Sequence, residues 1–459
     1  MIKKVAVLLV LVLLFQVFSG LFAVAANPFR DLVAQSAILA ERDTGKVLFE
    51  SNANMRYPAD SLTKVMTLLL AVYAVENDEI SDNELIIMTE TAWYGIDENS
   101  TTLDIQPGEV MTFIDLMYSA YVGNANEACN MIALRIAGSV GAFVEMMNDK
   151  ASEFGCLSTR FINATGQYHD FQLTTAYDQF VIFNEAMRSV LFAEIAGTFR
   201  HITESTDDSE SRTITSSNFM LNQSSRYYYR NCISGRDSST YEGGHSLIAF
   251  VEEEGLSLIS VVLGSDELIS DDGSVDRRSF SESIRLLQWA YTQFAWRDIL
   301  KTTDLLARVR VMHGSGADFV NVRPETPLLL LLDNSIPTES FIRTITIFYD
   351  EDDDPLIAPV SAGDVLGEVV ITRDGIEYAT IALVANTDVN LNSFEYIRRQ
   401  VTALLSTTIA RNIIIVLALL LILYIALVVR YNIVRANRLR RIKNAKNDII
   451  RDRHQNFRD

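Results

Sequence analysis

The chain has 459 residues, of which 49% are hydrophobic, and its 59 acidic and 39 basic side chains give a formal net charge of −20. This length allows two domains together with membrane elements. Thirteen of the basic and three of the acidic residues lie in the two end segments, so the part between them carries a formal charge near −30. That charge excludes a nucleic-acid partner and adhesion to an anionic membrane surface.

The N-terminal segment has the pattern of an export signal. Lys3 and Lys4 precede an apolar stretch that ends in small residues, among them Ala25 and Ala26. This pattern predicts a secretory signal peptide over residues 1–26. An uncleaved signal anchor is the alternative, and in both cases the body of the chain is exported.

The first predicted domain, residues 27–300, has strands on both sides of a helical block. Two strands in residues 36–51 meet at Asp43-Thr44-Gly45, a composition typical of a hairpin turn. Alternating strands return over residues 245–265. Helical spacing of apolar residues predicts helices in residues 61–76, 112–123, 126–138, 141–155, 174–187 and 279–296. This order predicts an α+β domain whose sheet uses both ends of the segment.

Short alternating strands then predict a small all-β domain over residues 301–398. Within it, Asp374-Gly375 is a strong hairpin signal. The acidic stretch YDEDDDPL, residues 349–356, is interpreted as a solvated loop, and a calcium site is the alternative.

The C-terminal end predicts a membrane anchor. Ile413 to Val429 is a run of 17 residues without a charge, which is just enough to cross a hydrocarbon layer. We therefore expect a transmembrane helix over residues 411–430, and a buried core helix is the alternative. By the positive-inside rule the basic tail, residues 431–459, is cytoplasmic. The expected localisation is the cell membrane, with a single pass and an extracytoplasmic body.

The sequence has three cysteines, Cys129, Cys156 and Cys232. Such a sparse and odd set is not a disulfide framework, so three buried thiols are the favoured interpretation and one bridge is the alternative. No His and Cys residues have metal-ligand spacing, and neither a metal nor an organic cofactor is expected.

Ser61 and Lys64 form an S-x-x-K pair in YPADSLTKVMT. Residues i and i+3 share one face of a helix, so Lys64 can reach the Ser61 hydroxyl. A lysine whose pKa is lowered by burial can take the serine proton, and the helix N-terminus offers N–H groups to a developing oxyanion. The alternative is a Ser/Thr helix cap beside an exposed lysine, and this motif alone leaves both open.

In its surroundings the motif resembles the serine-type D-Ala-D-Ala carboxypeptidases, the low-molecular-weight penicillin-binding proteins. The similar stretches include AILAERDTGKVLFESNANMRYPADSLTKVMT, LDIQPGEVMTFIDLMYSAYV, FINATGQYHDFQLTTAYD and APVSAGDVLGEVVI, and they cover most of residues 30–395. The resemblance implies a penicillin-binding or serine β-lactamase-like transpeptidase domain. That domain is followed by the small all-β domain and one C-terminal transmembrane helix.

The resemblance also implies roles for residues of the first two motifs. Ser61 is the nucleophile that forms an acyl-enzyme and Lys64 is its base, although Asp60 intervenes between the Pro-Ala pair and the serine. Asn124-Ala125-Asn126 takes the place of S-x-N. Asn126 then contacts the substrate and the lysine, whereas Asn124 replaces a serine whose hydroxyl relays protons more readily than an amide does.

The third motif is K-T-G in the family and Arg236-Asp237-Ser238 here, followed by Ser239. Arg236 keeps a positive charge that can hold the terminal carboxylate of a substrate. Asp237 stands where a threonine hydroxyl would bind that carboxylate, and Ser238 replaces a glycine. These four residues are the predicted substrate-binding set. Their replacement indicates a shifted substrate preference, a weakened enzyme or a strand that has lost its role.

The resemblance predicts a membrane-anchored serine carboxypeptidase that acts on peptidoglycan stem peptides ending in D-Ala-D-Ala, with β-lactams as covalent inhibitors. One alternative is a catalytically weakened or inactive homologue that binds peptidoglycan or a cell-wall partner, and another is a β-lactamase. His169 beside Asp170 invites a triad interpretation. The resemblance instead places both residues in a structural loop.

Overall fold

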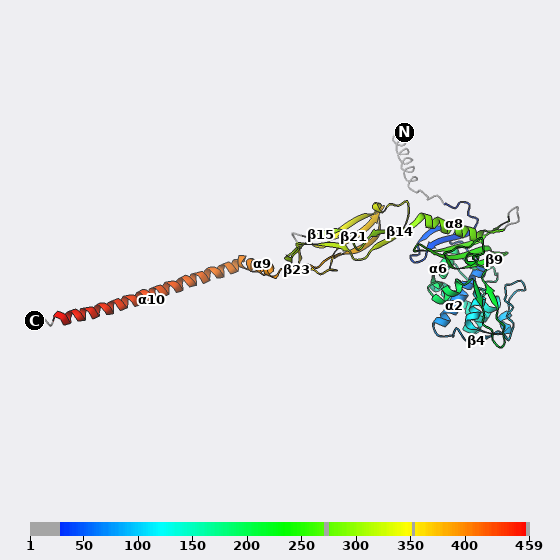
Figure 1. The fold of residues 1–459 in the computed structure, drawn as a ribbon, viewed down its shortest axis with the longest axis horizontal. Coiled ribbons are helices and arrows are strands. Elements are labelled where there is room, and N and C mark those ends of the chain that lie inside the picture. The colour runs from blue at the N-terminus through cyan, green and yellow to red at the C-terminus, as the bar shows by residue number, and fades with distance from the viewer. Residues whose placement is uncertain (1–27, 270–274, 351–353, 456–459) are drawn as a thin grey trace, which may run out of the picture. The chain divides into compact units, whose positions relative to one another are not determined.

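The computed structural model describes residues 28–269, 275–350 and 354–455, so the predicted signal peptide lies outside the described residues. The chain divides into two compact units, residues 1–296 with 332–335 and residues 297–331 with 336–459. Figure 1 shows a sheet with helices in the first unit, and strands followed by a long helix in the second.

A five-stranded antiparallel sheet in the order β2-β1-β11-β10-β9 is the frame of the first unit. The predicted hairpin is present, and its first strand pairs with a strand from the far end of the unit. The sheet therefore uses both ends of the segment, as predicted, and leaves β9 at an edge. The strands are β1 (Ser36–Glu41), β2 (Val47–Ser51), β9 (Cys232–Thr240), β10 (Gly244–Glu253) and β11 (Leu256–Ser265).

Helices cover both faces of this sheet, with α8 on one face and α6 on the other (Figure 1). Ten of the 13 residues of α2 are buried, so this helix runs through the core of the unit. Its first residue, Lys64, is thereby held inside the protein. The predicted helices are confirmed as α2 (Lys64–Glu76), α3 (Phe113–Tyr121), α4 (Asn126–Ala137), α5 (Val140–Glu153), α6 (Ala176–Ala186) and α8 (Arg278–Gln293).

Smaller elements complete the first unit. A short helix, α7 (Val190–Ala196), packs beside α2 and β9. The two-stranded ribbons are β3 (Tyr57–Pro58) with β6 (Leu173–Thr174), β4 (Leu85–Ile87) with β5 (Val110–Thr112), β7 (Arg200–Ile202) with β8 (Thr213–Thr215), and β12 (Glu267–Ile269) with β13 (Val275–Arg277).

A buried carboxylate binds the chain close to the first described residues. Glu282 on α8 accepts hydrogen bonds from the backbone N–H groups of Val33 (2.6 Å) and Ala34 (3.2 Å). Just before them, the ring of Phe29 packs edge-on against two aromatic rings, those of Phe49 and Trp289. These contacts fix the first described residues to the sheet and to α8.

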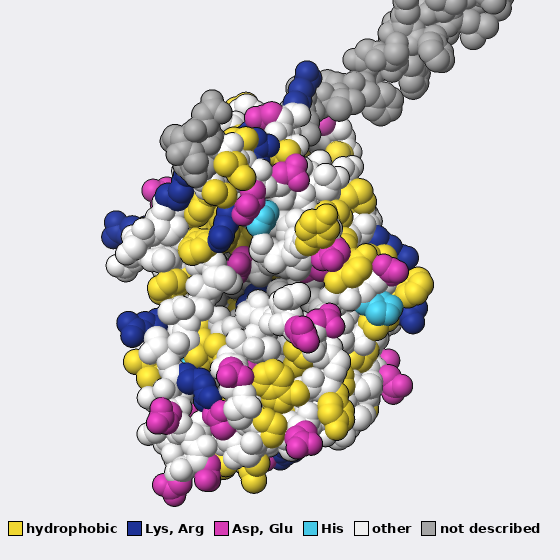
Figure 2. All heavy atoms as spheres, turned by 90° about the vertical axis from the view of Figure 1, so that its right-hand side faces the viewer, with side chains coloured by type: hydrophobic (Ala, Val, Ile, Leu, Met, Phe, Trp, Pro, Cys, Tyr) yellow, Lys and Arg dark blue, Asp and Glu magenta, His cyan; other side chains and the backbone are white. Residues whose placement is uncertain are grey.

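The surface carries the acidic excess of the sequence. Figure 2 shows a face on which Asp and Glu side chains are spread widely, and Lys and Arg side chains lie among them. Several arginines are ion-paired with carboxylates: Arg135 with Glu84 (2.6 Å), Arg212 with Glu109 (2.7 Å) and Arg285 with Asp31 (2.9 Å).

The second unit contains a six-stranded sheet in the order β19-β21-β22-β17-β15-β20, so the predicted all-β segment is confirmed. The predicted turn at Asp374-Gly375 joins β21 to β22, and both turn residues have positive φ, +52° and +79°, as a type I′ hairpin requires. The strands are β15 (Ala307–Met312), β17 (Phe319–Pro324), β19 (Ile342–Ile347), β20 (Leu356–Ile357), β21 (Val365–Arg373) and β22 (Ile376–Ala385).

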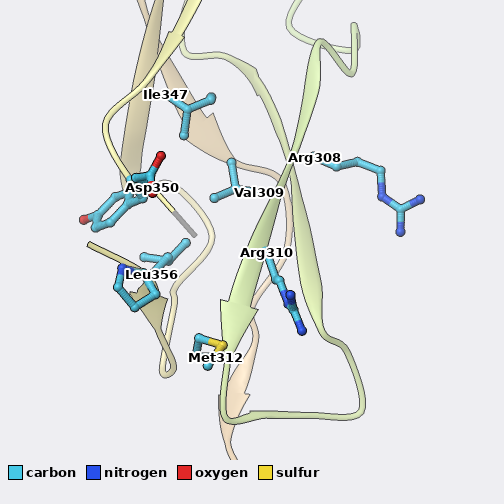
Figure 3. Close-up of a pocket in the computed structure, with 9 residues that line it drawn as sticks. Arg308, Val309, Arg310, Met312, Ile347, Asp350 and Leu356 are labelled. Carbon is cyan, nitrogen blue, oxygen red and sulfur yellow. The ribbon is translucent and has the colours of Figure 1, made fainter. Parts of the chain in front are cut away.

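A pocket of about 150 Å³ lies beside β15 in this unit. In Figure 3 the side chain of Val309 points toward Leu356, whereas that of Arg308 leaves from the other side of the strand. Arg308 lies over the ring of Phe319, 3.4 Å from its centroid. The predicted acidic loop borders this pocket at Asp350, and its residues 351–353 lie outside the described part of the chain. Among the described residues, no group of three His, Cys, Asp or Glu side chains is placed to hold a metal ion.

The chain ends in α9 (Ser393–Ser406) and α10 (Thr408–Gln455). Residues 411–444 of α10 are long and apolar enough to cross a membrane, and they include the predicted span. Their most apolar stretch is not buried in the protein, which argues against the alternative of a core helix.

Candidate active site

Ser61 lies at the centre of the candidate site, in a short turn that precedes α2. This turn is a 3₁₀ helix, η1 (Asp60–Thr63), so the expectation that Ser61 opens the α-helix itself is corrected. Asp60 has a φ of +42°, in the left-handed region, and this places the change of direction just before the serine. The half-buried Ser61 donates its backbone N–H to the hydroxyl of Ser238 (3.2 Å).

Lys64 follows Ser61 by one turn and is 2% exposed. Its amine donates to the side-chain oxygen of Asn126 (2.7 Å) and to the backbone oxygen of Thr165. Burial lowers the pKa of Lys64 to about 8, and the nearby Arg236 cation acts in the same direction. About a tenth of the amine is therefore neutral at pH 7, and the neutral amine is the form that can accept a proton.

Arg236 connects three parts of the site. It is 2% exposed, and its Nε donates to the backbone oxygen of Ser61 (3.2 Å). Its two terminal nitrogens donate to the backbone oxygen of Tyr121 and to the side-chain oxygen of Asn124. Asn124 has a φ of +59°, a region that asparagine tolerates better than most residues. The guanidinium thus ties η1 to the end of α3 and to the turn before α4.

The side chains of the predicted site residues on β9 point alternately to the two sides of the strand. Arg236 and Ser238 face η1, whereas Asp237 accepts a hydrogen bond from the hydroxyl of Ser217 (2.7 Å) on the opposite side. Ser239 is exposed. The structure therefore brings together Ser61, Lys64, Asn124, Asn126, Arg236 and Ser238, and it leaves Asp237 and Ser239 outside this set of contacts.

Asp60 is a charged group that the sequence did not single out for the site. It is 4% exposed, its Oδ2 accepts from the hydroxyl of Thr240 (2.8 Å), and its Oδ1 has no hydrogen-bond partner among the described residues. Burial raises the pKa of Asp60 to about 6. A buried carboxylate with one unpaired oxygen is costly to ionise, and it lies directly before the serine.

With this geometry established, comparison with known proteins is informative. A family model described as D-alanyl-D-alanine carboxypeptidase, peptidase family S11, matches residues 22–267, more than half of the chain. The chain belongs to this family. D-alanyl-D-alanine carboxypeptidase DacF of Bacillus subtilis is 26% identical over 364 residues, which are 79% of this chain and 87% of that protein. DacC of Escherichia coli is 26% identical over 366 residues, 77% and 84% of the two chains.

Solved structures support the fold of this S11 family member. Penicillin binding protein 5 from Haemophilus influenzae has a TM-score of 0.56 at 24% identity and covers 78% of this chain and 98% of its own. A peptidoglycan synthesis regulatory factor (PBP3) from Streptococcus pneumoniae has a TM-score of 0.58 at 22% identity, over 78% and 100% of the two chains. The predicted α+β fold of penicillin-binding type is confirmed.

Sequence reasoning missed the main-chain groups at the site of this S11 family member. The backbone oxygens of Thr165 and Tyr121 bind the two buried cations, and a backbone contact leaves no signature in the side-chain sequence. One signal was present at Gly166, which has a φ of +80°. A Cβ there would lie 2.1 Å from the backbone oxygen of Asp60, so only glycine lets this loop approach η1 so closely.

Two further predictions concern polar residues near the site. His169 and Asp170 are exposed, and His169 accepts from the backbone N–H of Phe171 (3.2 Å), which is a contact within the loop. Cys129, Cys156 and Cys232 are free thiols. The first two are buried and the third is half-buried.

Proposed function

We propose that this chain is a membrane-anchored serine carboxypeptidase that removes the terminal D-alanine from peptidoglycan stem peptides ending in D-Ala-D-Ala. The proposal is carried by one observation: Lys64 is buried with its pKa lowered to about 8, one turn after Ser61. The alternative of a capping serine beside an exposed lysine does not account for this burial. Membership of the S11 family supplies the substrate class.

In the proposed acylation step, the neutral amine of Lys64 takes the proton of Ser61 Oγ as that oxygen bonds to the carbonyl carbon of the penultimate D-alanine. The carbon becomes tetrahedral and its oxygen becomes negative. The C–N bond then breaks, and the departing nitrogen of the terminal D-alanine receives the proton from Lys64. An ester at Ser61 remains. Water cleaves this ester after losing a proton to Lys64, and the proton returns to Ser61 Oγ.

Asn126 and Asn124 are proposed to act on Lys64 in different ways. Asn126 holds the amine through its side-chain oxygen at 2.7 Å, which orients the lone pair in the neutral form. Asn124 binds Arg236 instead. Neither an amide nor a guanidinium exchanges protons readily near neutral pH, so Lys64 carries both proton transfers alone.

Carboxylate binding is proposed for Arg236, because the hydroxyl of Ser238 already accepts from the Ser61 N–H. Arg236 has five N–H bonds and uses three of them within the protein, which leaves two donors and its full charge for the substrate. Asp237 and Ser239, the other two residues predicted to bind the carboxylate, are assigned a secondary role at the rim of the edge strand. Because Asp237 directs its carboxylate to Ser217, its repulsion of the substrate is reduced.

Residues 411–444 of α10 are proposed to anchor the protein, with the basic tail in the cytoplasm and the carboxypeptidase unit outside. Protease added to intact cells freed of their wall should then digest an epitope on the body and spare one on the tail. Digestion of the tail epitope alone would reverse the proposed orientation.

The central test is acylation of the full-length protein in detergent by a fluorescent penicillin. We expect covalent labelling of the wild type and none of Ser61→Ala, followed by D-alanine release from a pentapeptide. Ser152→Ala, which changes an exposed serine on α5, is the matched control and should label normally.

The other outcomes separate the alternatives. A folded wild-type protein that neither labels nor releases D-alanine would favour an inactive homologue that binds the cell wall. Fast turnover of the penicillin, with the label lost as quickly as it forms, would favour a β-lactamase.

A further inference from the structure

A second recess lies in the first unit, away from the contacts that join Ser61, Lys64 and Arg236. It has a volume of about 540 Å³. Leu173 of β6 lies at the recess, and it pairs with Pro58 of β3 on one side and bridges to Arg160 on the other. Residues that line it include Arg56, Leu157, Thr159, Arg160, Phe171 and Leu173. We refer to it as the Arg56–Arg160 recess.

Two guanidinium groups face this recess from the same side of the ribbon. Pro58 and Arg160 both lie opposite Leu173, and Arg56 is two residues before Pro58, so strand alternation directs Arg56 and Arg160 alike. Both arginines are exposed, and neither has an ion pair or side-chain hydrogen bond to the described residues. Arg135, Arg212 and Arg285 of the same unit are each paired with a carboxylate, whereas Arg56 and Arg160 share one recess and have no carboxylate partner among the described residues.

The recess combines this charge with exposed apolar surface. Leu157 is 76% exposed and Phe171 is 64% exposed, and both lie at the recess. Beneath them the floor is held rigidly, because the buried hydroxyl of Thr159 donates to Asp178 (2.7 Å) and lies 2.9 Å from that of Thr174. A rigid floor, two free guanidiniums and an apolar rim are the features of a preformed site for an anionic ligand with a less polar face.

The acidic excess of the molecule does not cancel these cations. Charges separated by more than about 8 Å are largely screened at physiological ionic strength. An oxyanion in the recess therefore responds mainly to the charges at the recess itself, which are Arg56, Arg160 and the buried Asp178 that accepts from Thr159. Planar guanidiniums suit carboxylates in particular, since they can form two parallel hydrogen bonds with one carboxylate.

We propose that the Arg56–Arg160 recess binds a carboxylate-bearing segment of a peptidoglycan strand other than the stem peptide being cleaved. This inference rests on the proposed function for its choice of polymer. The recess is close to the site along the chain, since Arg56 lies five positions before Ser61, a distance of at most about 18 Å. The backbone N–H of Ala59 also bonds to the oxygen of Gln172, which joins the ribbon to η1. A strand held there keeps its neighbouring stem peptides at a high local concentration.

The test is binding to purified peptidoglycan sacculi that have been stripped of phosphate-containing polymers. Full-length protein in detergent is used in a Ser61→Ala background, so the result does not depend on turnover. We expect the added pair Arg56→Ala and Arg160→Ala to raise the apparent Kd at least tenfold, with an unchanged melting temperature. The matched control is the pair Arg200→Ala and Arg230→Ala, two exposed arginines whose loss changes the net charge equally and should leave the Kd unchanged.

A second arm tests the ligand chemistry. Sacculi whose carboxylates have been amidated should bind the Ser61→Ala protein as weakly as native sacculi bind the Arg56/Arg160 variant. Equal binding by both arginine pairs would overturn the proposal. So would binding that requires the phosphate-containing polymers. A wild-type protein that penicillin does not label at Ser61 would, in contrast, overturn the proposed function without changing this binding result.

Discussion

The site has two walls, η1 with α2 on one side and β9 on the other. The polar groups of the two walls have different surroundings. On the first wall Lys64 is surrounded by the core, and its pKa is lowered to about 8. On the second wall Arg236 and Ser238 are already bonded to backbone groups of the protein. One wall therefore holds an amine that can accept a proton, while the other holds a guanidinium that has three of its five N–H groups bonded within the protein.

Replacing Lys64 should have the largest effect on acylation. If it had no effect, the contrast drawn between the two walls would be wrong. In Lys64→Met the base is lost while the buried volume is kept, so we expect penicillin acylation to slow by roughly 10²- to 10⁴-fold. The wild-type rate should rise with pH and level off above about 8, because only the neutral amine accepts the Ser61 proton. The measurement is the second-order rate of labelling from pH 6 to 10.

Lys150→Met serves as the control, since Lys150 is ion-paired with Glu153 on α5 and should leave the rate unchanged. A rate that is flat across this pH range, or a Lys64→Met variant that labels normally, would remove Lys64 from the mechanism.

The next largest effect concerns Asp60, which joins the two walls through Thr240. Its pKa is raised from 3.8 to about 6, so ionising it in the folded state costs roughly 3 kcal/mol above pH 6, and this cost vanishes below pH 4. Asp60→Asn should therefore raise the free energy of unfolding by up to about 3 kcal/mol at pH 8, with a gain that shrinks as the pH falls toward 4. Asparagine also tolerates the left-handed backbone there.

Denaturant unfolding at pH 8, 6 and 4 measures this gain. The control is Asp170→Asn, in an exposed loop, for which little change is expected. A gain for Asp60→Asn that is equal at all three pH values would show that charge burial is not its cause.

The smallest expected effect concerns Ser238 on β9, the second wall of the site. The Ser61 N–H now donates to the hydroxyl of Ser238 (3.2 Å), whereas an oxyanion formed at Ser61 needs that donor. Ser238→Gly should free it and speed acylation by about fivefold, since one neutral hydrogen bond is worth about 1 kcal/mol. The same labelling assay applies. Ser239→Gly, next on the strand, controls for the added backbone freedom, and equal rates in both variants would contradict the argument.

Local sequence patterns were sufficient for one hairpin in each unit and for the core helix that carries Lys64. The turn residues Asp43-Thr44-Gly45 and Asp374-Gly375 mark the hairpins found in the two units, and apolar spacing marks α2. These signals work because turns and amphipathic helices depend on residues close in sequence.

The contacts within the site depend on tertiary structure and could not be predicted from local sequence patterns. The facing of β9 required its register, which is why Asp237 was grouped with Arg236 although the two point to opposite sides. The 3₁₀ turn at Ser61 depends on the backbone of Asp60, which packs against a loop more than 100 residues away at Gly166. Such long-range backbone contacts have no local sequence pattern.

The carboxylate of Glu282 has a practical consequence for protein engineering. Because it binds the backbone N–H groups of Val33 and Ala34, it holds this part of the chain against α8. A purification tag or fluorescent fusion should therefore end before Phe29, whose ring packs on Phe49 and Trp289. A junction placed three or four residues later would remove an aromatic contact and leave a buried acid short of partners.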